Sequence, residues 1–494
     1  MGLPNKAISE AKERVRAALS AMNIAMPAKR ITVNLSPADM PKDGSHFDLP
    51  IAVALLSALG MIAEDEIANC VFMGELSLNA ELVSVTGCLP AAVTAAGENK
   101  RLFCPLPCGA EAAWVDATQV IAAERLGDIL RHLTGQAILP PAEPGKIDTT
   151  PHAKDMAEVK GQERAKRAME IAAAGRHHLL MIGAPGSGKS MLAARLPSIM
   201  PPLTPQEALE TSMIHSLAGL LEDGGISADR PFREPHHTSS MAAIVGGGRG
   251  AKPGEISLAH NGVLFMDEFP EFPRNVLETL RQPIETGEVV VARANAHVKY
   301  PCRFMLVAAA NPCRCGHMAD PSQACARAPA CGAEYLSRIS GPLIDRFDLM
   351  VDVPQVKYAD LESPSMGENS QTIATRIAAA RDIQTQRFAA QEDIRVNADA
   401  EGHVLESFAK SDATGTAFFR QAADRFNLTA RGYHRLWRVA RTIADLEGSD
   451  DILQKHISEA VSFRIPETAY PRAKRNAADA AQPAKMAMAS DNRP

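Results

Sequence analysis

A glycine-rich segment in the middle of the chain has the residue types and spacing of a phosphate-binding loop. Residues 183–190 read GAPGSGKS, which fits the pattern G-x-x-x-x-G-K-[S/T], in which backbone N–H groups surround the phosphates of a nucleotide. The glycines allow the backbone to approach the phosphates and to take positive φ angles. Lys189 is expected to reach the β- and γ-phosphates, and the Ser190 hydroxyl is expected to bind Mg²⁺.

The residues on either side place this segment between a strand and a helix. Residues 178–182 (HLLMI) form an apolar run typical of a buried strand, and residues 190–196 (SMLAARL) have the pattern of a helix. A helix that begins at the loop directs its positive N-terminal end at the phosphates. We therefore predict a nucleotide site; a glycine-rich turn that fits the pattern by chance is the alternative.

Two further strand-like segments end in polar residues suited to ATP hydrolysis. Residues 262–266 (GVLFM) lead into Asp267, expected in the Mg²⁺ shell, and Glu268, expected to polarise the attacking water. A third strand leads into Asn311, which is expected to orient that water. Two solvated acids at a strand end are the alternative. The predicted nucleotide-binding residues are Gly183, Pro185, Gly186, Ser187, Gly188, Lys189, Ser190 and Asp267, and Ser190 and Asp267 are the predicted Mg²⁺ ligands.

An arginine late in the chain completes this chemistry. Residues 337–348 (SRISGPLIDRFD) place Arg346 at the end of a predicted helix. An arginine there can stabilise transition-state charge on the ATP of a neighbouring subunit, which is worth several orders of magnitude in rate. An arginine supplied by a neighbour implies a ring.

Four cysteines follow Asn311 closely in the sequence: Cys313, Cys315, Cys325 and Cys331. Four thiolates can hold a tetrahedral structural Zn²⁺. The spacing departs from paired C-x2-C motifs, and His317 can replace one ligand. Reduced thiols in a loop are the alternative, and the sequence leaves both interpretations open.

Length and composition restrict the class of protein. A chain of 494 residues is too long for one hydrophobic core and suggests about three domains. The formal net charge is -6, so a nucleic-acid contact would need a local basic patch. The sequence has neither a signal peptide nor an apolar run near the roughly 18 residues of a membrane helix. We expect a cytoplasmic protein with no membrane contact.

The first 135 residues predict a compact α/β unit. Apolar spacing predicts helices at 7–19 and 47–59 and a strand at 31–35. Residues 71–78 and 82–85 predict the two strands of a hairpin.

Parts of this unit resemble the protease domain of Lon, a ribosomal-S5-like α/β fold. The resemblance rests on residues 40–48 (MPKDGSHFD) and 74–78 (GELSL). It implies a nucleophilic serine where this chain has His46 and a lysine base where it has Pro90. Proline has no titratable group, so we expect the fold without proteolysis. A dyad of Ser45 with His46 is disfavoured, because neighbours in a loop rarely face each other.

Longer motifs in the rest of the chain resemble the magnesium-chelatase-like AAA+ ATPases. They are GGG at 246–248, PGEISLAHNG at 253–262, DEFPEF at 267–272, NPCRCG at 311–316 and SGPLIDR at 340–346. Within that family the chain resembles the ComM and YifB subfamily, from Gly2 to about Arg464. Family members have enough residues before the equivalent of Gly2 for about two or three strands. We therefore expect the amino-terminal domain to lack its first strands.

The resemblance implies an α/β multidomain protein. Its parts are a Lon-like non-proteolytic domain (1–135), a proline-rich linker (136–156), an AAA+ P-loop NTPase core (157–355), an α-helical lid (356–465) and a disordered tail (466–494). In the lid, Thr429 is a predicted helix N-cap. Arg431 is implied as a catalytic sensor of the γ-phosphate; a surface arginine is the alternative.

Two insertions in the core suggest a nucleic-acid contact. One surrounds residues 231–238, and the other is a predicted hairpin at 285–300. In related helicases such loops line a central pore and hold a DNA backbone. The basic residues predicted to contact phosphates are Arg249, Lys252, Arg293 and Lys299. Solvated hairpin charges explain the same pattern.

These observations predict a Mg²⁺-dependent ATPase that forms a homo-hexameric ring. The resemblance implies a motor for branch migration of single-stranded or branched DNA in homologous recombination, which helps transforming DNA to integrate during competence. Rival interpretations are a chelatase motor subunit and an ATP-dependent protease or unfoldase. A non-functional relic left by truncation is a third.

Overall fold

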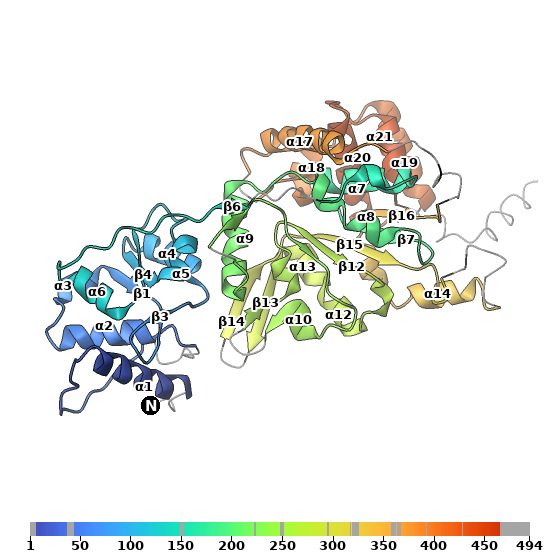
Figure 1. Cartoon of the computed structure of the whole chain (residues 1–494). Helices are drawn as coiled ribbons and strands as arrows, with labels where there is room; N and C mark the ends of the chain where they lie inside the picture. The colour runs from blue at the N-terminus through green and yellow to red at the C-terminus, as the bar shows by residue number, and fades with distance from the viewer. Residues whose placement is uncertain are drawn as a thin grey trace, which may run out of the picture.

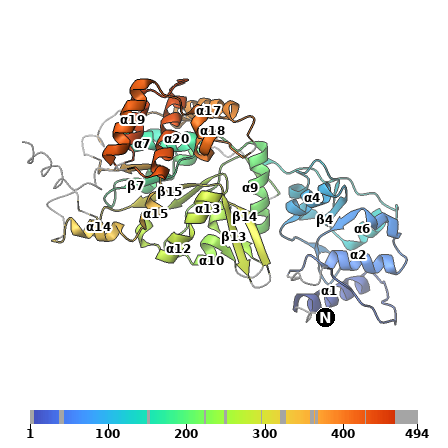
Figure 2. The same cartoon turned by 180° about the vertical axis from the view of Figure 1, so that it is seen from behind.

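The computed structural model describes residues 6–36, 44–148, 153–221, 224–247, 251–293, 296–316, 318, 326–356, 362, 367–391, 393–426 and 428–464. Figure 1 shows a smaller body formed by the first part of the chain (blue) and a larger body formed by the rest. Figure 2 shows the same arrangement from behind. No helix within these described ranges combines the length and apolarity that a membrane crossing needs.

A three-stranded parallel sheet forms the centre of the smaller body. Its strand order is β1 (Cys70–Phe72), β4 (Arg101–Pro105) and β5 (Val120–Ala123), and a separate antiparallel hairpin joins β2 (Glu75–Leu76) to β3 (Leu82–Val83). The helices are α1 (Lys6–Ala21), α2 (Asp48–Ala58), α3 (Glu64–Ala68), α4 (Cys88–Gly97), α5 (Leu106–Ala112) and α6 (Leu126–Leu133). Buried Leu49, Leu56 and Phe103 belong to the core that these elements share.

Two of the predictions for this body need correction. The helices predicted at 7–19 and 47–59 are confirmed by α1 and α2, but the strand predicted at 31–35 is wrong. Its apolar side chains Ile31 and Val33 are exposed, because no neighbouring strand of the described chain pairs with this segment. The predicted hairpin is shorter than expected, since Cys70–Phe72 pairs with β4 instead.

A five-stranded parallel sheet forms the centre of the larger body. Its strand order is β16 (Leu349–Asp352), β7 (Leu179–Ile182), β15 (Met305–Ala310), β12 (Val263–Met266) and β9 (Phe232–Arg233). β7, β12 and β15 are buried throughout, as expected for parallel strands covered on both faces. Because the strands are parallel, their carboxyl ends meet at one edge of the sheet, where ligands bind in open α/β folds.

Helices of different lengths and two hairpins surround this sheet. The helices are η1 (Met156–Glu158), α7 (Glu163–Gly175), α8 (Lys189–Ala193), η2 (Leu196–Ile199), α9 (Pro205–Ala218), α10 (Met241–Val245), α11 (Glu255–Leu258), η3 (Phe269–Glu271), α12 (Arg274–Thr279), α13 (Arg281–Thr286), α14 (Ala330–Leu336) and α15 (Gly341–Ile344). The antiparallel hairpins are β10 (Gly246–Gly247) with β11 (Lys252–Pro253) and β13 (Glu288–Arg293) with β14 (Ala296–Pro301).

Helices of the last part of the chain cover one side of the larger body (Figure 1). They are α17 (Ser370–Arg387), η4 (Asn397–Asp399), α18 (Gly402–Phe408), α19 (Ala413–Phe426), α20 (Ala430–Leu446) and α21 (Gln454–Ser462). The hydroxyl of Thr429 accepts a hydrogen bond from the Gly432 N–H (3.1 Å), which confirms the predicted N-cap of α20. Trp437 stacks on Phe419 with ring centroids 4.3 Å apart, which fixes α20 against α19.

The two bodies meet at α9. β6 (Ile147–Asp148) pairs with β8 (Ile226–Ser227) in parallel, so part of the predicted linker is held by the larger body. Buried Glu111 accepts hydrogen bonds from the Cys88 N–H (3.1 Å) and the Ser216 hydroxyl (3.3 Å). Burial raises the pKa of Glu111, and these donors oppose the rise.

Candidate nucleotide-binding site

The predicted phosphate loop lies between β7 and α8. Gly186 and Gly188 have φ angles of 73° and 93°, a region that favours glycine. A Cβ at Gly183 would lie 2.2 Å from the carbonyl oxygen of Val353, so this position excludes any side chain. The Ser187 hydroxyl is buried and has no hydrogen-bond partner within the described part of the chain. These features fit a loop that surrounds phosphate oxygens.

Lys189 is held at the mouth of this loop. Its Nζ donates to the carbonyl oxygens of Gly183 (2.8 Å) and Ala184 (3.0 Å) and to Oδ1 of Asn311 (3.2 Å). Burial lowers the pKa of its ammonium group, and nearby Asp267 and Glu268 oppose the shift. The acceptors are neutral, so a charged phosphate forms stronger hydrogen bonds with this lysine than they do.

Ser190 and Asp267 lie beside Lys189, as predicted. The Ser190 hydroxyl donates to Oδ2 of Asp267 over 2.5 Å, and Oδ1 of Asp267 accepts from the Glu268 N–H over 2.8 Å. Hydroxyl and carboxylate oxygens are the hard ligands that Mg²⁺ prefers. The residues present therefore fit a magnesium ion next to a bound triphosphate.

Glu268 contacts a histidine that the sequence analysis did not identify. Its carboxylate Oε2 lies 3.2 Å from Nδ1 of His237, and its side chain is 51% exposed. The register of the sheet explains the contact, because Phe232 of β9 lies opposite Val263 of β12. The same offset places His237 level with Glu268 beyond the strand ends. The sequence alone does not reveal this contact, because it does not give the register in which β9 pairs with β12.

Three of the four predicted zinc ligands lie together. The sulfur atoms of Cys313, Cys315 and Cys331 all lie within 4.8 Å of one another. Cys325 and His317 lie outside the described residues. Cys313 and Cys315 share a loop with Asn311, and Cys331 lies in α14. The loop packs on the phosphate loop, since a Cβ at Gly316 would lie 2.3 Å from Cδ of Pro185.

Arg346 and Arg431 lie together rather than beside the phosphate loop. Arg346 is buried and pairs with the Glu285 carboxylate over 2.5 Å. Arg431 is 63% exposed and lies 3.5 Å from the same carboxylate. Nothing in the sequence pattern marks Glu285, an acid near the end of α13, as a partner of two arginines.

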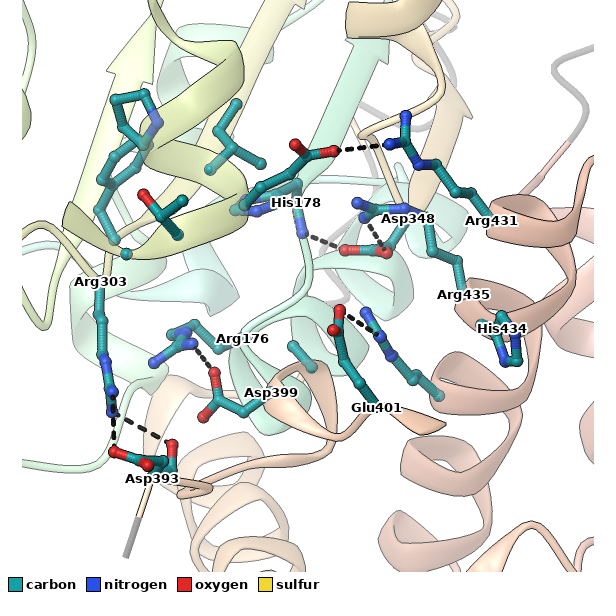
Figure 3. Close-up of a pocket in the computed structure, with 18 of the residues that line it drawn as sticks. Arg176, His178, Arg303, Asp348, Asp393, Asp399, Glu401, Arg431, His434 and Arg435 are labelled. Carbon is teal, nitrogen blue, oxygen red and sulfur yellow. Dashed lines mark hydrogen bonds and ion pairs between the residues drawn. The ribbon is translucent and has the colours of Figure 1, made fainter. Parts of the chain in front are cut away.

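A cavity of about 660 Å³ lies next to this pair of arginines. Figure 3 shows its lining, in which Arg431 and Arg435 of α20 point toward the sheet and Arg435 pairs with Asp348. His178 and Asp348 directly precede β7 and β16, so the cavity lies at the amino ends of these strands. None of its described lining residues belongs to the phosphate loop. Other ion pairs in its wall are Arg176–Asp399, Arg303–Asp393 and Arg438–Glu401.

The hairpin predicted at 285–300 is formed by β13 and β14, and it packs against the hairpin of β10 and β11, which was not predicted. The Tyr300 hydroxyl of β14 donates to the carbonyl oxygen of Ala251, over 2.9 Å, just before β11. Lys252 is exposed, and Lys299 is 71% exposed and lies 3.5 Å from the Glu288 carboxylate. Arg249 and the side chain of Arg293 lie outside the described part.

Two segments of the smaller body carry the positions singled out by the resemblance to Lon. Ser45 donates a hydrogen bond to Glu75. The His46 ring lies against Phe47, with centroids 4.2 Å apart, and burial lowers the pKa of its imidazole. Pro90 lies in the first turn of α4. The Ser45 hydroxyl therefore donates to Glu75 and not to the neighbouring His46 ring.

Comparisons with known proteins cover almost the whole chain. Residues 1–107 match a family model described as subunit ChlI of Mg-chelatase, residues 155–361 match magnesium chelatase, subunit ChlI, and residues 367–464 match its C-terminal model. The chain is 42% identical over 470 residues to the competence protein ComM of Haemophilus influenzae, covering 94% of this chain and 91% of that protein. It is 39% identical over 465 residues to the uncharacterized protein YifB of Escherichia coli, covering 94% and 90%. Similarity to the magnesium-chelatase 38 kDa subunit of Rhodobacter capsulatus is 25% over 335 residues, covering 62% and 85%.

Proposed function

The chain belongs to the magnesium-chelatase family of AAA+ ATPases, within the ComM and YifB subfamily, and from this premise we propose that it is a Mg²⁺-dependent ATPase motor. The observation that carries the proposal is the convergence of Lys189, Ser190 and Asp267 at one edge of the sheet. These groups bind a triphosphate and a metal ion in P-loop ATPases.

The proposed mechanism gives each residue of this edge one task. The phosphate loop and Lys189 hold ATP, and Ser190 and Asp267 hold Mg²⁺, which neutralises phosphate charge when bound. Glu268 accepts a proton from the attacking water, and Asn311 orients that water. The hydrogen bond between Asn311 and Lys189 supports this assignment, because it keeps the amide beside the phosphate site.

We assign Arg346 and Arg431 to the ATP of a neighbouring subunit in a homo-hexameric ring. Both contact Glu285 near the amino ends of β7 and β16, whereas the phosphate loop follows the carboxyl end of β7. One subunit therefore presents ATP at one edge of its sheet and arginines near the other. A ring of identical subunits brings the two edges together.

The proposed client is single-stranded or branched DNA during homologous recombination and competence. The likeness to the competence protein ComM supports this assignment, as do the basic side chains on two hairpins that pack together. Replacing Lys252 and Lys299 by Ala is expected to weaken DNA binding and reduce its dependence on salt. Lys455→Ala on α21 is the matched control, because this exposed lysine lies outside the hairpins.

The deciding experiment measures ATP hydrolysis by the purified chain with and without a synthetic four-way DNA junction. Stimulation by the junction that is lost in Glu268→Gln is the expected result. Hydrolysis that is indifferent to single-stranded, duplex and branched DNA would overturn the DNA assignment and leave the ATPase. Absence of hydrolysis with Mg²⁺ and every DNA form would overturn the ATPase itself.

Two rival functions remain testable with the same protein. The chelatase subunit of Rhodobacter capsulatus aligns with 62% of this chain, against 94% for ComM, which favours the DNA motor. The family model that matches residues 1–107 is also named after a chelatase subunit, so the first domain alone does not distinguish a DNA motor from a chelatase. Stimulation by a porphyrin would favour the chelatase, and degradation of casein would favour a protease.

The proposal extends to the identity of the domains and to the location of the protein. We assign residues 1–135 to a Lon-like domain without proteolysis and residues 356–465 to the lid, with a cytoplasmic location. The pairing of Ser45 with Glu75 and the presence of Pro90 in α4 support the absence of proteolysis. The contacts of α20 with α7 and α17 support a helical unit seated on the core.

We further assign a structural Zn²⁺ to the four predicted ligands Cys313, Cys315, Cys325 and Cys331, of which Cys313, Cys315 and Cys331 lie within the described residues. Their sulfur atoms lie close enough for one ion, given Zn–S bonds of about 2.3 Å. Metal analysis of protein purified without chelators should give about one zinc ion per chain. Serine at any of these cysteines should remove it, whereas Cys70→Ser should not. Metal-free protein with all thiols reactive would overturn the assignment.

A further inference from the structure

Arg435 of α20 is an arginine that the proposed mechanism leaves unused. Its Nη1 donates to Oδ1 of Asp348 and to the backbone carbonyl oxygen of Arg346, each over 2.7 Å. Its side chain is 12% exposed, so water competes little for these hydrogen bonds. A charged donor also forms stronger hydrogen bonds than a neutral one. Arg435 therefore joins α20 to the backbone of the arginine that we assign to the ATP of the neighbouring subunit.

The segment that carries Arg346 depends on the last helices of the chain for its position. Residues 345–348 connect α15 to β16. They lie just past the end of α15, where a helix leaves carbonyl oxygens without partners in its own backbone. Two arginines take up two such oxygens, because Arg435 donates to that of Arg346 and Arg464 donates to that of Phe347. The place of this segment is thus set by α20 and by the residues that follow α21.

The side chain of Arg346 is held by acceptors that a phosphate can replace. It is 4% exposed and donates to the Glu285 carboxylate and to the carbonyl oxygens of Arg281 and Pro342. A triphosphate of a neighbouring subunit has to draw the guanidinium group away from these acceptors. From then on only the backbone of Arg346 determines where the group can reach. A displacement of about 1 Å in such a group can lower a rate about 10²-fold.

The helix α20 can hold this backbone because the helix is itself fixed. Arg431 and Arg435 lie four residues apart, so they share one face of α20, and both point toward the sheet (Figure 3). The opposite contacts of the helix, with α7 and α17, seat it on the core. Arg431 approaches the Glu285 carboxylate that also binds the side chain of Arg346. One helix therefore contacts both the backbone of Arg346 and the partner of its side chain.

We propose that Arg435 is a positioning residue that fixes the backbone of Arg346, so that its side chain reaches the ATP of the neighbouring subunit. The proposal rests on the proposed function, because Arg346 has this task only in the proposed ring. Arg435 does not itself contact ATP and acts through Arg346. Its hydrogen bond makes α20 and the segment before β16 one mechanical unit.

The test separates this hydrogen bond from the ion pair with Asp348. Replacing Arg435 alone would leave a buried carboxylate without its cation, which destabilises the fold. The reference is therefore Asp348→Asn, which keeps the donor to the Arg346 carbonyl oxygen. The test variant combines Asp348→Asn with Arg435→Met, which removes this donor but keeps a long, unbranched side chain. Steady-state ATP hydrolysis by the full chain is measured beside binding of a fluorescent ATP analogue and thermal unfolding.

The double variant should have a kcat about 10- to 100-fold below that of Asp348→Asn, because Arg346 is misplaced. KM for ATP should stay within about twofold, since the phosphate loop of the same chain is unchanged. Subunits of the double variant should regain activity when mixed with Glu268→Gln subunits, which still supply Arg346, but not when mixed with Arg346→Ala subunits. A kcat equal to that of Asp348→Asn would overturn the positioning role and leave Arg435 as the partner of a buried acid.

Arg438→Ala is the matched control. Arg438 lies on the same helix, but it pairs with Glu401 from the last part of the chain instead of the segment before β16. Its kcat should stay within about twofold of the wild type. A loss as large as that of the double variant would show that any change in the wall of the cavity slows hydrolysis, which would also overturn the proposal.

Failure of the proposed function looks different. A wild type without hydrolysis, or an Arg346→Ala variant with the wild-type rate, would remove the assignment of Arg346 and this proposal with it. An Arg346→Ala variant that loses activity, beside equal rates for the double variant and Asp348→Asn, would overturn only the role of Arg435.

Discussion

The two edges of the five-stranded sheet are assembled in different ways. At the carboxyl edge, Asp267 and Asn311 directly follow β12 and β15, and Lys189 follows the loop after β7. At the amino edge, Glu285, Asp348 and Arg435 come from α13, the residue before β16 and α20. The order of the parallel strands is enough to bring the residues of the carboxyl edge together. Ion pairs between distant segments, such as Arg435 with Asp348, place those of the amino edge.

This difference suggests how the work is divided between chains. In the proposed mechanism, the carboxyl edge holds the groups that bind ATP and activate water within one chain. The amino edge holds Arg346 and Arg431, which pair with Glu285 and do not lie beside the phosphate loop of their own chain. We therefore expect the carboxyl edge to act within its own chain and the amino edge to act on its neighbour.

Among the substitutions that test this comparison, Arg346→Ala should have the largest effect on the rate of ATP hydrolysis. Loss of an arginine that stabilises transition-state charge from a neighbouring subunit is expected to lower kcat by about 10³-fold or more. ATP binding should persist, because the phosphate loop is unchanged. The measurement is steady-state hydrolysis beside binding of a fluorescent ATP analogue. Arg338→Ala is the control, since this exposed arginine pairs with Glu271 instead of Glu285.

Glu268→Gln should lower kcat by about 10²–10⁴-fold, because the amide cannot accept the proton from water. Mixing two variants tests whether the two edges act in different subunits. Subunits with Glu268→Gln still supply Arg346 to a neighbour, and subunits with Arg346→Ala still supply Glu268, so a mixture should regain part of the activity. A mixture of Glu268→Gln with Lys189→Ala should not, because both changes lie on the carboxyl edge. Recovery in the second mixture would contradict the division of labour.

The sequence predicted the carboxyl edge well, for a physical reason. Residues that follow buried parallel strands are brought together by the sheet, so strand recognition was enough to place Asp267 beside Ser190. It could not place Arg431, because the position of α20 depends on packing against α7 and α17. The strand predicted at 31–35 failed similarly: Ile31 and Val33 alternate like a strand, but the described chain provides no partner strand.

Asp348→Asn should test the packing of the amino edge. Asp348 is 4% exposed and accepts from Arg435 (2.7 Å) and from the His178 N–H (2.9 Å). Burial alone would raise its pKa, but Arg435 and His177 hold that pKa well below its usual value. Removing the charge leaves Arg435 without its carboxylate partner, and we expect a loss of about 3 kcal/mol of stability.

The pH dependence of this loss follows from the lowered pKa. Asp348 contributes its stability above its unfolded pKa of about 4 and loses it only as the pH falls through its lower folded pKa. The difference between the wild type and Asp348→Asn should thus be constant from pH 7 to 5 and shrink in stronger acid. Urea unfolding followed by Trp437 fluorescence in a Trp114→Phe background measures it. A difference that grew with acidification would contradict the prediction.

The smallest expected effect, on KM for ATP, concerns a contact between the phosphate loop and the loop that contains Cys313 and Cys315. Gly316 has φ of 84°, and a Cβ there would lie 2.3 Å from Cδ of Pro185 in the phosphate loop. Gly316→Ala should displace this loop and raise KM for ATP about fivefold while kcat changes little, since Glu268 and Asp267 keep their places. Gly341→Ala is the control, because its Cβ would meet no atom within 4 Å. An unchanged KM would mean that the cysteine loop only lies beside the phosphate loop, and the carboxyl edge would then owe its geometry to the strands alone.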